Sequence, residues 1–264
     1  MGRIEDKFSE LKKQGRKALI TFVTAGDPDI ATTARIVDEM ERRGADIIEL
    51  GIPYSDPIAE GPVIQAANAR ALKHSIKISD IMLSVKEMRK TVKVPLLYLL
   101  YCNCILQYGI DRFFADCAAV GLDGVIIPDL PFEERDELEG AADKNGIIMI
   151  TLVTPTSGVR VEMLTRKAKG FIYCVSSLGV TGVRSTFNTD FREFFSRINS
   201  AATIPKVIGF GISTAEHIKQ LKGYTDGLIV GSAMVKKIEA AANAEEAVNV
   251  AGLYTAELRA AMDL

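Results

Sequence analysis

The chain has 264 residues, of which 48% are hydrophobic and 25% are charged, and its 34 acidic and 32 basic side chains leave a formal net charge of -2. This balance argues against a polyanion-binding surface, and the charged segment from Met1 to Lys7 lacks the apolar core of a secretory signal. The longest uncharged run, residues 94–110, contains Pro95 and Gly109, so it predicts a buried strand and a turn rather than a membrane span. We expect a cytoplasmic protein that binds neither nucleic acid nor membrane.

Cysteine and histidine are too sparse for a metal cluster. The four cysteines are Cys102, Cys104, Cys117 and Cys174. They form no Cys-x-x-Cys pair, and the two histidines, His74 and His217, stand far apart. We predict reduced thiols, no metal site, and ordinary surface or helix roles for the histidines.

Apolar, β-branched runs alternate with helical segments along the whole chain. We predict strands at residues 18–23, 46–50, 95–100, 124–127, 147–153, 170–175, 206–208 and 227–230. Eight strands in 264 residues give 33 residues per unit, the size of one strand plus one helix. The predicted fold class is α/β: a (β/α)8 TIM barrel with additional helices, forming a single domain over residues 1–264.

Several helix boundaries are also predicted. Asp27 is the expected N-cap of the first long helix, with Pro28 at its first position and Gly44 at its end. Residues 213–216 have the spacing of a capping box, and residues 131–134 put acidic side chains in the first turn of a helix.

Three aspartates form a weak internal repeat, because Asp46, Asp123 and Asp226 each stand just before an apolar strand. The connections after the second and sixth strands are longer than the others. Loops at the carboxyl ends of barrel strands build the active sites of this architecture, so these two connections are where we expect the site.

Glu49 is the first candidate for chemistry. It lies near the end of the strand 46–50, and strand alternation places it with Ile47 on one face. A carboxylate on the inner face of a barrel is costly unless it is paired or used, and burial would raise its pKa toward neutrality. An ion pair at the barrel mouth is the structural alternative to proton transfer.

The loop that follows, residues 51–62, contains three prolines, two glycines and two more acids, Asp56 and Glu60. Such a loop is shaped and partly rigid. A second carboxylate that approached Glu49 across a pocket would form a pair suited to acid–base catalysis, whereas a loop acid without a function would simply face solvent.

Glycine-containing segments follow the last three strands, at residues 179–182, 209–213 and 231–232. Glycine lets backbone N–H groups approach an anion closely, and helix N-termini add a favourable dipole. Because three such segments lie at equivalent strand ends, they predict a phosphate site, although each alone is more typical of a turn.

Four segments, residues 22–28, 49–57, 127–131 and 209–213, resemble the tryptophan synthase alpha subunit family. The resemblance continues in order to Gly231-Ser232 and so covers nearly the whole chain. It implies a (β/α)8 barrel that cleaves indole-3-glycerol phosphate by retro-aldol chemistry into indole and glyceraldehyde 3-phosphate, in the biosynthesis of L-tryptophan. It also implies no cofactor in this chain, a pyridoxal-phosphate-dependent beta subunit as partner, and an alpha2beta2 complex.

The resemblance further implies roles for individual residues. Glu49 matches the glutamate that shuttles protons, and Glu60 stands where the family has an aspartate that receives the indole N–H. Residues expected to line the indole and propanol portions, with core packing as the alternative for the first two, are Phe22, Leu99, Tyr101, Tyr173 and Thr181. Residues expected at the phosphate are Gly182, Phe210, Gly211, Ile212, Gly231 and Ser232.

Three positions depart from the family pattern. Glu60 is one methylene longer than aspartate, Ser177 stands where an arginine is common, and Cys104 stands where a proline is common. The lyase subunit has two alternatives: a weakly catalytic partner that binds and regulates the beta subunit, which Glu60 and Ser177 favour, or a lyase that acts without a partner. Indole release measured with and without a beta subunit distinguishes the three.

Overall fold

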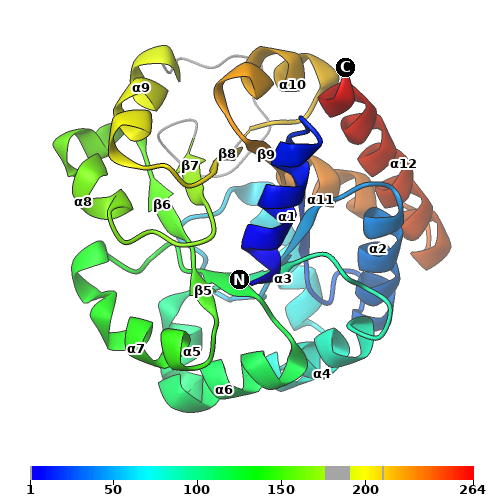
Figure 1. The fold of residues 1–264 in the computed structure, drawn as a ribbon. Helices are drawn as coiled ribbons and strands as arrows, with labels where there is room; N and C mark the ends of the chain where they lie inside the picture. The colour runs from blue at the N-terminus through cyan, green and yellow to red at the C-terminus, as the bar shows by residue number, and fades with distance from the viewer. Residues whose placement is uncertain (1, 176–190, 210) are drawn as a thin grey trace.

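The computed structural model describes residues 2–175, 191–209 and 211–264 (Figure 1). Its strands are β1 (Ala18–Thr24), β2 (Ile47–Gly51), β3 (Leu96–Leu99), β4 (Gly124–Ile126), β5 (Ile148–Met149), β6 (Thr151–Val153), β7 (Ile172–Val175), β8 (Lys206–Gly209) and β9 (Gly227–Val230). All pair in parallel, in the order β5-β4-β3-β2-β1-β9-β8-β7-β6. Each predicted strand is present, with ends shifted by at most about two residues.

The predicted strand at 147–153 is divided, and this division closes the barrel. Its first part, β5, pairs with β4, while its second part, β6, pairs with β7. The two parts meet at Ile150, whose N–H still donates to Val125 O at 2.9 Å. One continuous segment therefore joins the two ends of the sheet, and nine short strands make the eight-membered barrel that was predicted.

Helices surround the barrel, and one of them, α1 (Arg3–Lys13), lies across its end (Figure 1). The others are α2 (Ile30–Arg42), α3 (Pro62–Leu72), α4 (Ile78–Met88), α5 (Cys102–Tyr108), α6 (Ile110–Val120), α7 (Asp136–Lys144), α8 (Val161–Thr165), α9 (Phe191–Ala201), α10 (Ala215–Leu221), α11 (Ser232–Glu239) and α12 (Ala244–Asp263). The long connection between β2 and β3 holds two helices, α3 and α4, which explains its length.

The apolar residues form two main layers, as strand alternation requires. Along β2, Ile48 and Leu50 point outward and pack beneath the helices, whereas Ile47 points into the barrel. The inner layer also contains Ile20 of β1 and Leu97 of β3. Glu49 follows the inward direction of Ile47.

Helix α1 closes the amino end of the barrel, a feature that the sequence analysis missed. Its buried side chains, Ile4, Phe8 and Leu11, belong to the inner apolar layer. Phe8 packs on Phe171 with ring centroids 5.7 Å apart. The positions i, i+4 and i+7 of these three residues are those of an amphipathic helix and could have predicted it.

Two predicted helix caps are wrong by one or two residues. The N-cap of α2 is Asp29, which accepts from Thr32 N at 2.8 Å, whereas Asp27 forms an ion pair with Arg70. The N-cap of α10 is Thr214 rather than Ser213, because Thr214 Oγ1 accepts the His217 N–H. In both places the next residue able to cap takes the role. Residues 132–134 form a 3-10 turn that leads into α7.

The three repeated aspartates share one geometry at the amino ends of the strands. Each aspartate forms two hydrogen bonds with one residue at the start of the neighbouring strand. Its backbone N–H donates to the carbonyl of that residue, and its carboxylate accepts the N–H of that residue. The partners of Asp46, Asp123 and Asp226 are Leu19, Leu96 and Lys206, with N···O distances of 2.8, 2.8 and 2.9 Å. The repeat is therefore a recurring link between adjacent strands.

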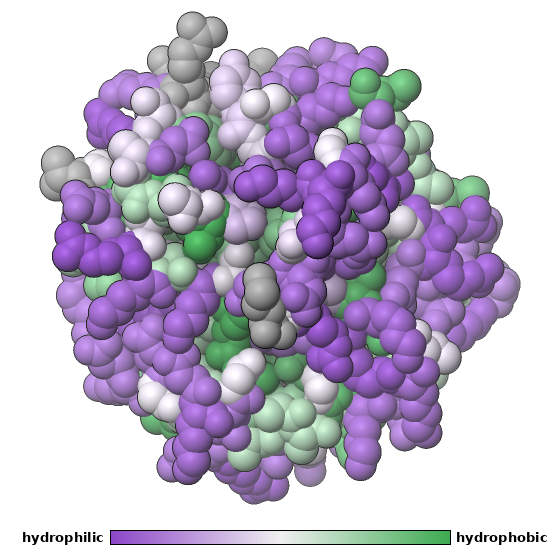
Figure 2. Space-filling model, in the orientation of Figure 1, coloured by the Kyte–Doolittle hydropathy of each residue, from purple (hydrophilic) through white to green (hydrophobic). Residues whose placement is uncertain are grey.

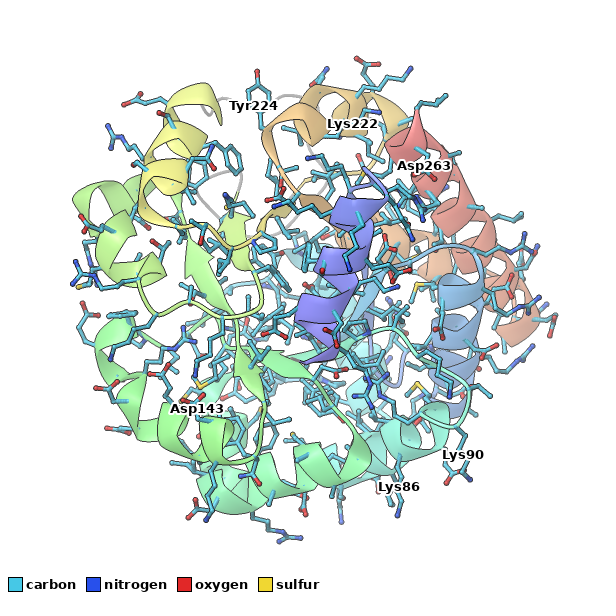
Figure 3. All side chains as sticks on the ribbon, viewed as in Figure 1. Lys86, Lys90, Asp143, Lys222, Tyr224 and Asp263 are labelled. Atoms are coloured by element: carbon cyan, nitrogen blue, oxygen red, sulfur yellow. The ribbon has the colours of Figure 1, made fainter. Side chains whose placement is uncertain are left out.

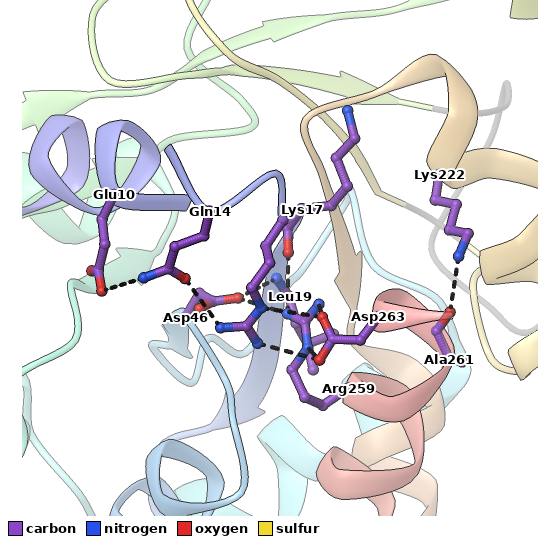
Figure 4. A network of polar contacts seen from close by, with 10 residues as sticks. Glu10, Gln14, Lys17, Leu19, Asp46, Lys222, Arg259, Ala261 and Asp263 are labelled. Atoms are coloured by element: carbon purple, nitrogen blue, oxygen red, sulfur yellow. Dashed lines mark hydrogen bonds and ion pairs between the residues drawn. The ribbon is translucent and has the colours of Figure 1, made fainter. Parts of the chain in front are cut away.

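Arginines complete two of these links, and at the third Lys17 Nζ lies 3.9 Å from Asp226. Arg259 of α12 lies 3.0 Å from Asp46 and also binds Asp263 (Figure 4). Asp123 pairs with Arg89 and with Arg3. These arginines neutralise carboxylates that are buried beneath the helices.

The face that carries α1 is mostly hydrophilic (Figure 2). Around its rim, charged side chains such as Lys86 and Asp143 point away from the barrel (Figure 3). None of the helices in the described ranges is both long and apolar enough to span a bilayer.

Candidate active site

Glu49 lies inside the barrel near the carboxyl end of β2. Its neighbours in the sheet are Phe22 of β1 and Leu97 of β3. The side chain is 1% exposed, and Oε1 has no hydrogen-bond partner among the described residues. The structural alternative for this residue, an ion pair at the barrel mouth, is not formed with any described cation.

Burial raises the pKa of Glu49 from its ordinary 4.5 to about 8. Desolvation is the cause, since ionisation would place a charge in an apolar interior. The Tyr173 phenol lies near enough for the Glu49 charge to raise the pKa of that phenol, in addition to the larger effect of burial. At neutral pH this carboxyl can both give up and take a proton, which a solvated carboxylate cannot do as readily.

Glycines leave room for the rings beside Glu49. A Cβ on Gly51 would lie 2.5 Å from Phe22 Cζ, and a Cβ on Gly209 would lie 2.3 Å from the Tyr173 hydroxyl. Phe22 also packs in a small apolar cluster with Ile64, Ala67 and Val235, against which Leu99 rests. Both alternatives for Phe22 are thus compatible with its position, since it packs in a cluster and borders Glu49.

The loop between β2 and α3 carries the second buried carboxyl. Glu60 is 6% exposed, and its Oε2 accepts a hydrogen bond from Asn68 Nδ2 at 3.1 Å. Burial raises the pKa of Glu60 to about 7, while the Asn68 amide and the Tyr101 hydroxyl favour its ionised form and limit the rise. Asp56 is exposed and accepts only from Ser55 in the described structure, so the loop holds one candidate acid rather than two.

Tyr101 connects this loop to the end of β3. Its hydroxyl accepts the Ala59 N–H at 2.9 Å, and its ring stacks on Tyr54 with centroids 4.9 Å apart. Asn103 of α5 donates to the Tyr54 hydroxyl at 3.1 Å. Asp129, after β4, accepts the Cys102 N–H at 2.9 Å and fixes the start of α5. The Glu60 loop is thereby attached to two other strand ends.

The predicted phosphate segments lie partly in the described ranges. Gly211 has φ +77°, a backbone conformation that favours glycine, and Ile212 is buried. Gly231 is the N-cap of α11, Ser232 is its first residue, and a Cβ on Gly231 would lie 3.6 Å from Phe22 Cβ. The end of β9 therefore lies beside Phe22, the residue that also neighbours Glu49 in the sheet. Gly182, Phe210, Thr181 and Ser177 lie outside the described residues.

Asn68 is the functional candidate that the sequence analysis missed. It lies on the buried face of α3 with Ile64, Ala67 and Ala71, and it is the polar residue among these positions. A polar side chain inside an apolar helical stripe was the available signal. Its partner could not be read from the helix, because Glu60 reaches it from the preceding loop.

No group of three or more potential ligands among histidine, cysteine, aspartate and glutamate could hold a metal ion within the described ranges. The two described carboxyls with the most strongly raised pKa values are Glu49 and Glu60, and both lie around the carboxyl ends of the strands. This arrangement provides proton donors and acceptors near neutral pH, with apolar and aromatic walls between the strand ends.

Known proteins resemble this chain in sequence and in fold. The tryptophan synthase alpha chain family model matches residues 8–263. A tryptophan synthase alpha chain from Thermoanaerobacter sp. (strain X514) is 51% identical over 259 residues, which cover 98% of this chain and 99% of the relative. One from Thermoanaerobacter pseudethanolicus is 54% identical over 246 residues, covering 93% and 94%.

Solved structures agree with these relatives. The crystal structure of the tryptophan synthase alpha chain from Legionella pneumophila has a TM-score of 0.91 at 35% identity and covers 100% of this chain and 98% of its own. Mycobacterium tuberculosis tryptophan synthase gives a TM-score of 0.90 at 32% identity, with coverage of 100% and 99%.

Alpha chains of this family have no cofactor of their own and work with a beta subunit, which holds pyridoxal phosphate. The family model spans almost the whole chain, and the two relatives cover 98% and 93% of it. The chain belongs to the tryptophan synthase alpha chain family, and it is a lyase that cleaves indole-3-glycerol phosphate to indole and glyceraldehyde 3-phosphate.

Proposed function

We propose that Glu49 is the residue that moves protons during this cleavage. The observation that carries the proposal is a carboxyl buried inside the barrel with a pKa of about 8 and an oxygen that has no described partner. Protonated Glu49 donates to C3 of the indole ring, which makes the ring a leaving group. The resulting carboxylate then takes the proton of the glycerol hydroxyl as the carbon–carbon bond breaks, so that indole and the aldehyde form and Glu49 is protonated again.

Glu60 is the second carboxylate in this proposal. Protonation of C3 places positive charge on the ring nitrogen, and a carboxylate that accepts the N–H stabilises that charge. The burial of Glu60 and its hydrogen bond to Asn68 support the assignment, because a side chain without a role would face solvent, as Asp56 does. Glu60 thus takes the place of the family aspartate.

The remaining site residues follow the same assignment. We place the indole and propanol portions against the side chains of Phe22, Leu99, Tyr101, Tyr173 and Thr181. We place the phosphate on the backbone N–H groups of Gly182, Phe210, Gly211, Ile212, Gly231 and Ser232. The left-handed Gly211 and the start of α11 at Ser232 support the phosphate site, since both present N–H groups that a helix or strand does not use.

The assembly and location complete the proposal. We infer one domain over residues 1–264, an alpha2beta2 complex with the beta subunit, and a cytoplasmic enzyme. The inner and outer apolar layers support one domain, because both run around the entire barrel. Co-purification with the beta subunit, followed by measurement of the mass in solution, tests the stoichiometry.

Substitution of Glu60 tests the proposal where this chain departs from its family. With saturating beta subunit, Glu60→Gln should lower kcat by about 10²-fold, because an amide holds the shape but cannot stabilise the charge. Glu60→Asp should keep most of the activity. A wild-type rate in Glu60→Gln contradicts the role of Glu60.

The same assay without beta subunit measures the activity of the chain alone. A slow basal rate that rises when the beta subunit is added supports a catalytic alpha chain within a complex. Equal rates in both conditions indicate a lyase that acts alone. A rate near zero in both conditions, with the beta reaction still stimulated, indicates a regulatory partner.

A further inference from the structure

The Glu60 carboxyl is held by an amide rather than by a cation. Asn68 is 3% exposed and donates from Nδ2 to Glu60 Oε2 at 3.1 Å. Helix α3 is itself fixed beneath the site, because Ile64 and Ala67 pack with Phe22 and Val235. The donor therefore comes from a rigid element, whereas the acceptor comes from a loop.

Outside the site, three buried aspartates in the described part of the chain are paired with cations. Asp46 pairs with Arg259, Asp123 with Arg89, and Asp27 with Arg70. Arg70 lies on α3 two residues after Asn68, on a different face of the helix, and it pairs with Asp27. Glu60 differs from these three aspartates because its partner, Asn68, is a neutral amide.

A neutral donor suits an acid that must stabilise positive charge on a substrate. A cation beside Glu60 would cancel the negative charge that the indole ring needs, and it would cost catalytic power even with perfect geometry. An amide fixes one carboxylate oxygen and leaves the net charge in place. It also restricts a side chain that has one more rotatable bond than aspartate.

We propose that Asn68 is the positioning residue of Glu60: it fixes the carboxylate toward the substrate and favours its ionised form without neutralising it. This inference rests on the proposed role of Glu60. Tyr101 shares the task from the end of β3, because its hydroxyl accepts from Ala59 and lies beside the same carboxyl. Among the described residues, the side chains that shift the pKa of Glu60 are those of Asn68 and Tyr101, and neither of them is a cation.

The sign of the expected pH effect follows from the hydrogen bond. An amide N–H binds the carboxylate better than the neutral acid, so it lowers the pKa of Glu60 against the effect of burial. Loss of the amide raises that pKa. If ionised Glu60 is the active form, the acid limb of the pH–rate profile then moves to higher pH.

The decisive variant is Asn68→Ala, measured as the complex with saturating beta subunit. We expect the acid limb of kcat/KM for indole release to move up by about one pH unit, with an activity about tenfold lower at pH 7 that is partly regained at higher pH. The matched control is Gln65→Ala on the same helix. Gln65 donates to the backbone carbonyl of Glu60 at 2.8 Å, not to its carboxylate, so the limb should stay in place.

Two further measurements separate positioning from stability. In a Glu60→Gln background, Asn68→Ala should cause little additional loss, since the carboxylate it serves is absent. If Asn68→Ala folds poorly, Asn68→Asp replaces it with a side chain of nearly the same shape, and the second carboxylate should move the acid limb further in the same direction.

The outcomes distinguish this inference from the role on which it rests. A wild-type rate in Glu60→Gln overturns the role of Glu60 and, with it, the inference. If Glu60→Gln is impaired but the acid limb of Asn68→Ala or Asn68→Asp is unmoved, only the inference is overturned. An equal loss from Asn68→Ala with and without Glu60 also overturns it, because the effect would then be structural.

Discussion

Buried acids have different partners at the amino and carboxyl ends of the same barrel. At the amino end, Asp46 and Asp123 each bind a backbone N–H and at least one arginine. At the carboxyl end, Glu49 has an oxygen without a described partner, and Glu60 has only neutral donors among the described residues. The first pair links strands, whereas the second pair keeps its acids available for proton transfer and charge stabilisation.

The comparison shows that the acid expected to destabilise the fold, Glu49, lies at the catalytic end of the barrel. An unpaired acid in an apolar interior destabilises the fold, whereas removing one partner of a buried ion pair leaves an uncompensated charge. Substitutions at the carboxyl end should therefore lower activity and leave stability unchanged or higher. Substitutions at the amino end should lower stability and leave activity unchanged.

The largest effect is expected for Glu49→Gln. The amide keeps the shape but cannot transfer protons, so indole release should fall by roughly 10²–10⁴-fold while ligand binding changes little. Steady-state kinetics with the beta subunit, together with calorimetric binding of a substrate analogue, measure both. A variant that keeps most of its turnover removes Glu49 from the mechanism.

The same variant should be more stable than the parent at alkaline pH. Since the pKa of Glu49 is raised to about 8 from 4.5, the folded protein binds more protons than the unfolded chain between these values, and its stability falls as pH rises through this window. Glutamine does not titrate. Glu49→Gln should therefore gain about 1–4 kcal/mol at pH 8 over its value near pH 5, relative to the parent, in denaturant titrations at both pH values.

Arg259→Ala tests the opposite end of the barrel. It leaves the Asp46 carboxylate buried without its cation, so we expect a loss of about 3–5 kcal/mol in the free energy of unfolding and an unchanged kcat for the folded fraction. Arg16→Ala is the matched control, because Arg16 pairs with the same helix end at the exposed Asp263. That pair should contribute less than about 1 kcal/mol. Similar losses in both variants would contradict the distinction between buried and exposed pairs.

The pH dependence of the parent enzyme sharpens the comparison further. Activity should rise as Glu60 loses its proton near pH 7 and fall as Glu49 loses its proton near pH 8. A bell-shaped profile of kcat/KM for indole release is the expected result, since the reaction needs ionised Glu60 and protonated Glu49. A profile that is flat between pH 6 and 9 would mean that neither acid titrates in the rate-limiting step.

The smallest effect is expected at the phosphate end. Ser232→Ala removes a hydroxyl but keeps the backbone N–H at the start of α11, so KM should rise only a few-fold, equivalent to about 1 kcal/mol. Crystals soaked with a phosphate ester should show it beside Gly211, Gly231 and Ser232. A phosphate found at the α1 end of the barrel would show that this assignment is wrong.

Sequence periodicity was enough to predict the strands, because a parallel barrel needs continuous apolar runs at regular spacing. It also indicated Glu49, since an acid inside such a run is costly. The break at Ile150 was not predictable, because it arises where the sheet must close and neighbouring strands on both sides decide the pairing.

The partners of the acids were harder to predict than the acids themselves. Asn68, Tyr101 and Glu60 are brought together by a helix, a strand end and a loop, and no local pattern states that they meet. The same holds for Arg259, which reaches Asp46 from 213 positions later in the chain. Tertiary contacts of this kind depend on the closed barrel and not on any single segment.

Helix α1 has a consequence for how small molecules move through this enzyme. Because Ile4, Phe8 and Leu11 fill the amino end of the barrel, any molecule that reaches Glu49 has to enter from the carboxyl end and depart by the same route. Substrate and both products therefore share a single path, and they cannot pass through the molecule from one side to the other. A subunit that covered the carboxyl end would therefore receive the indole first.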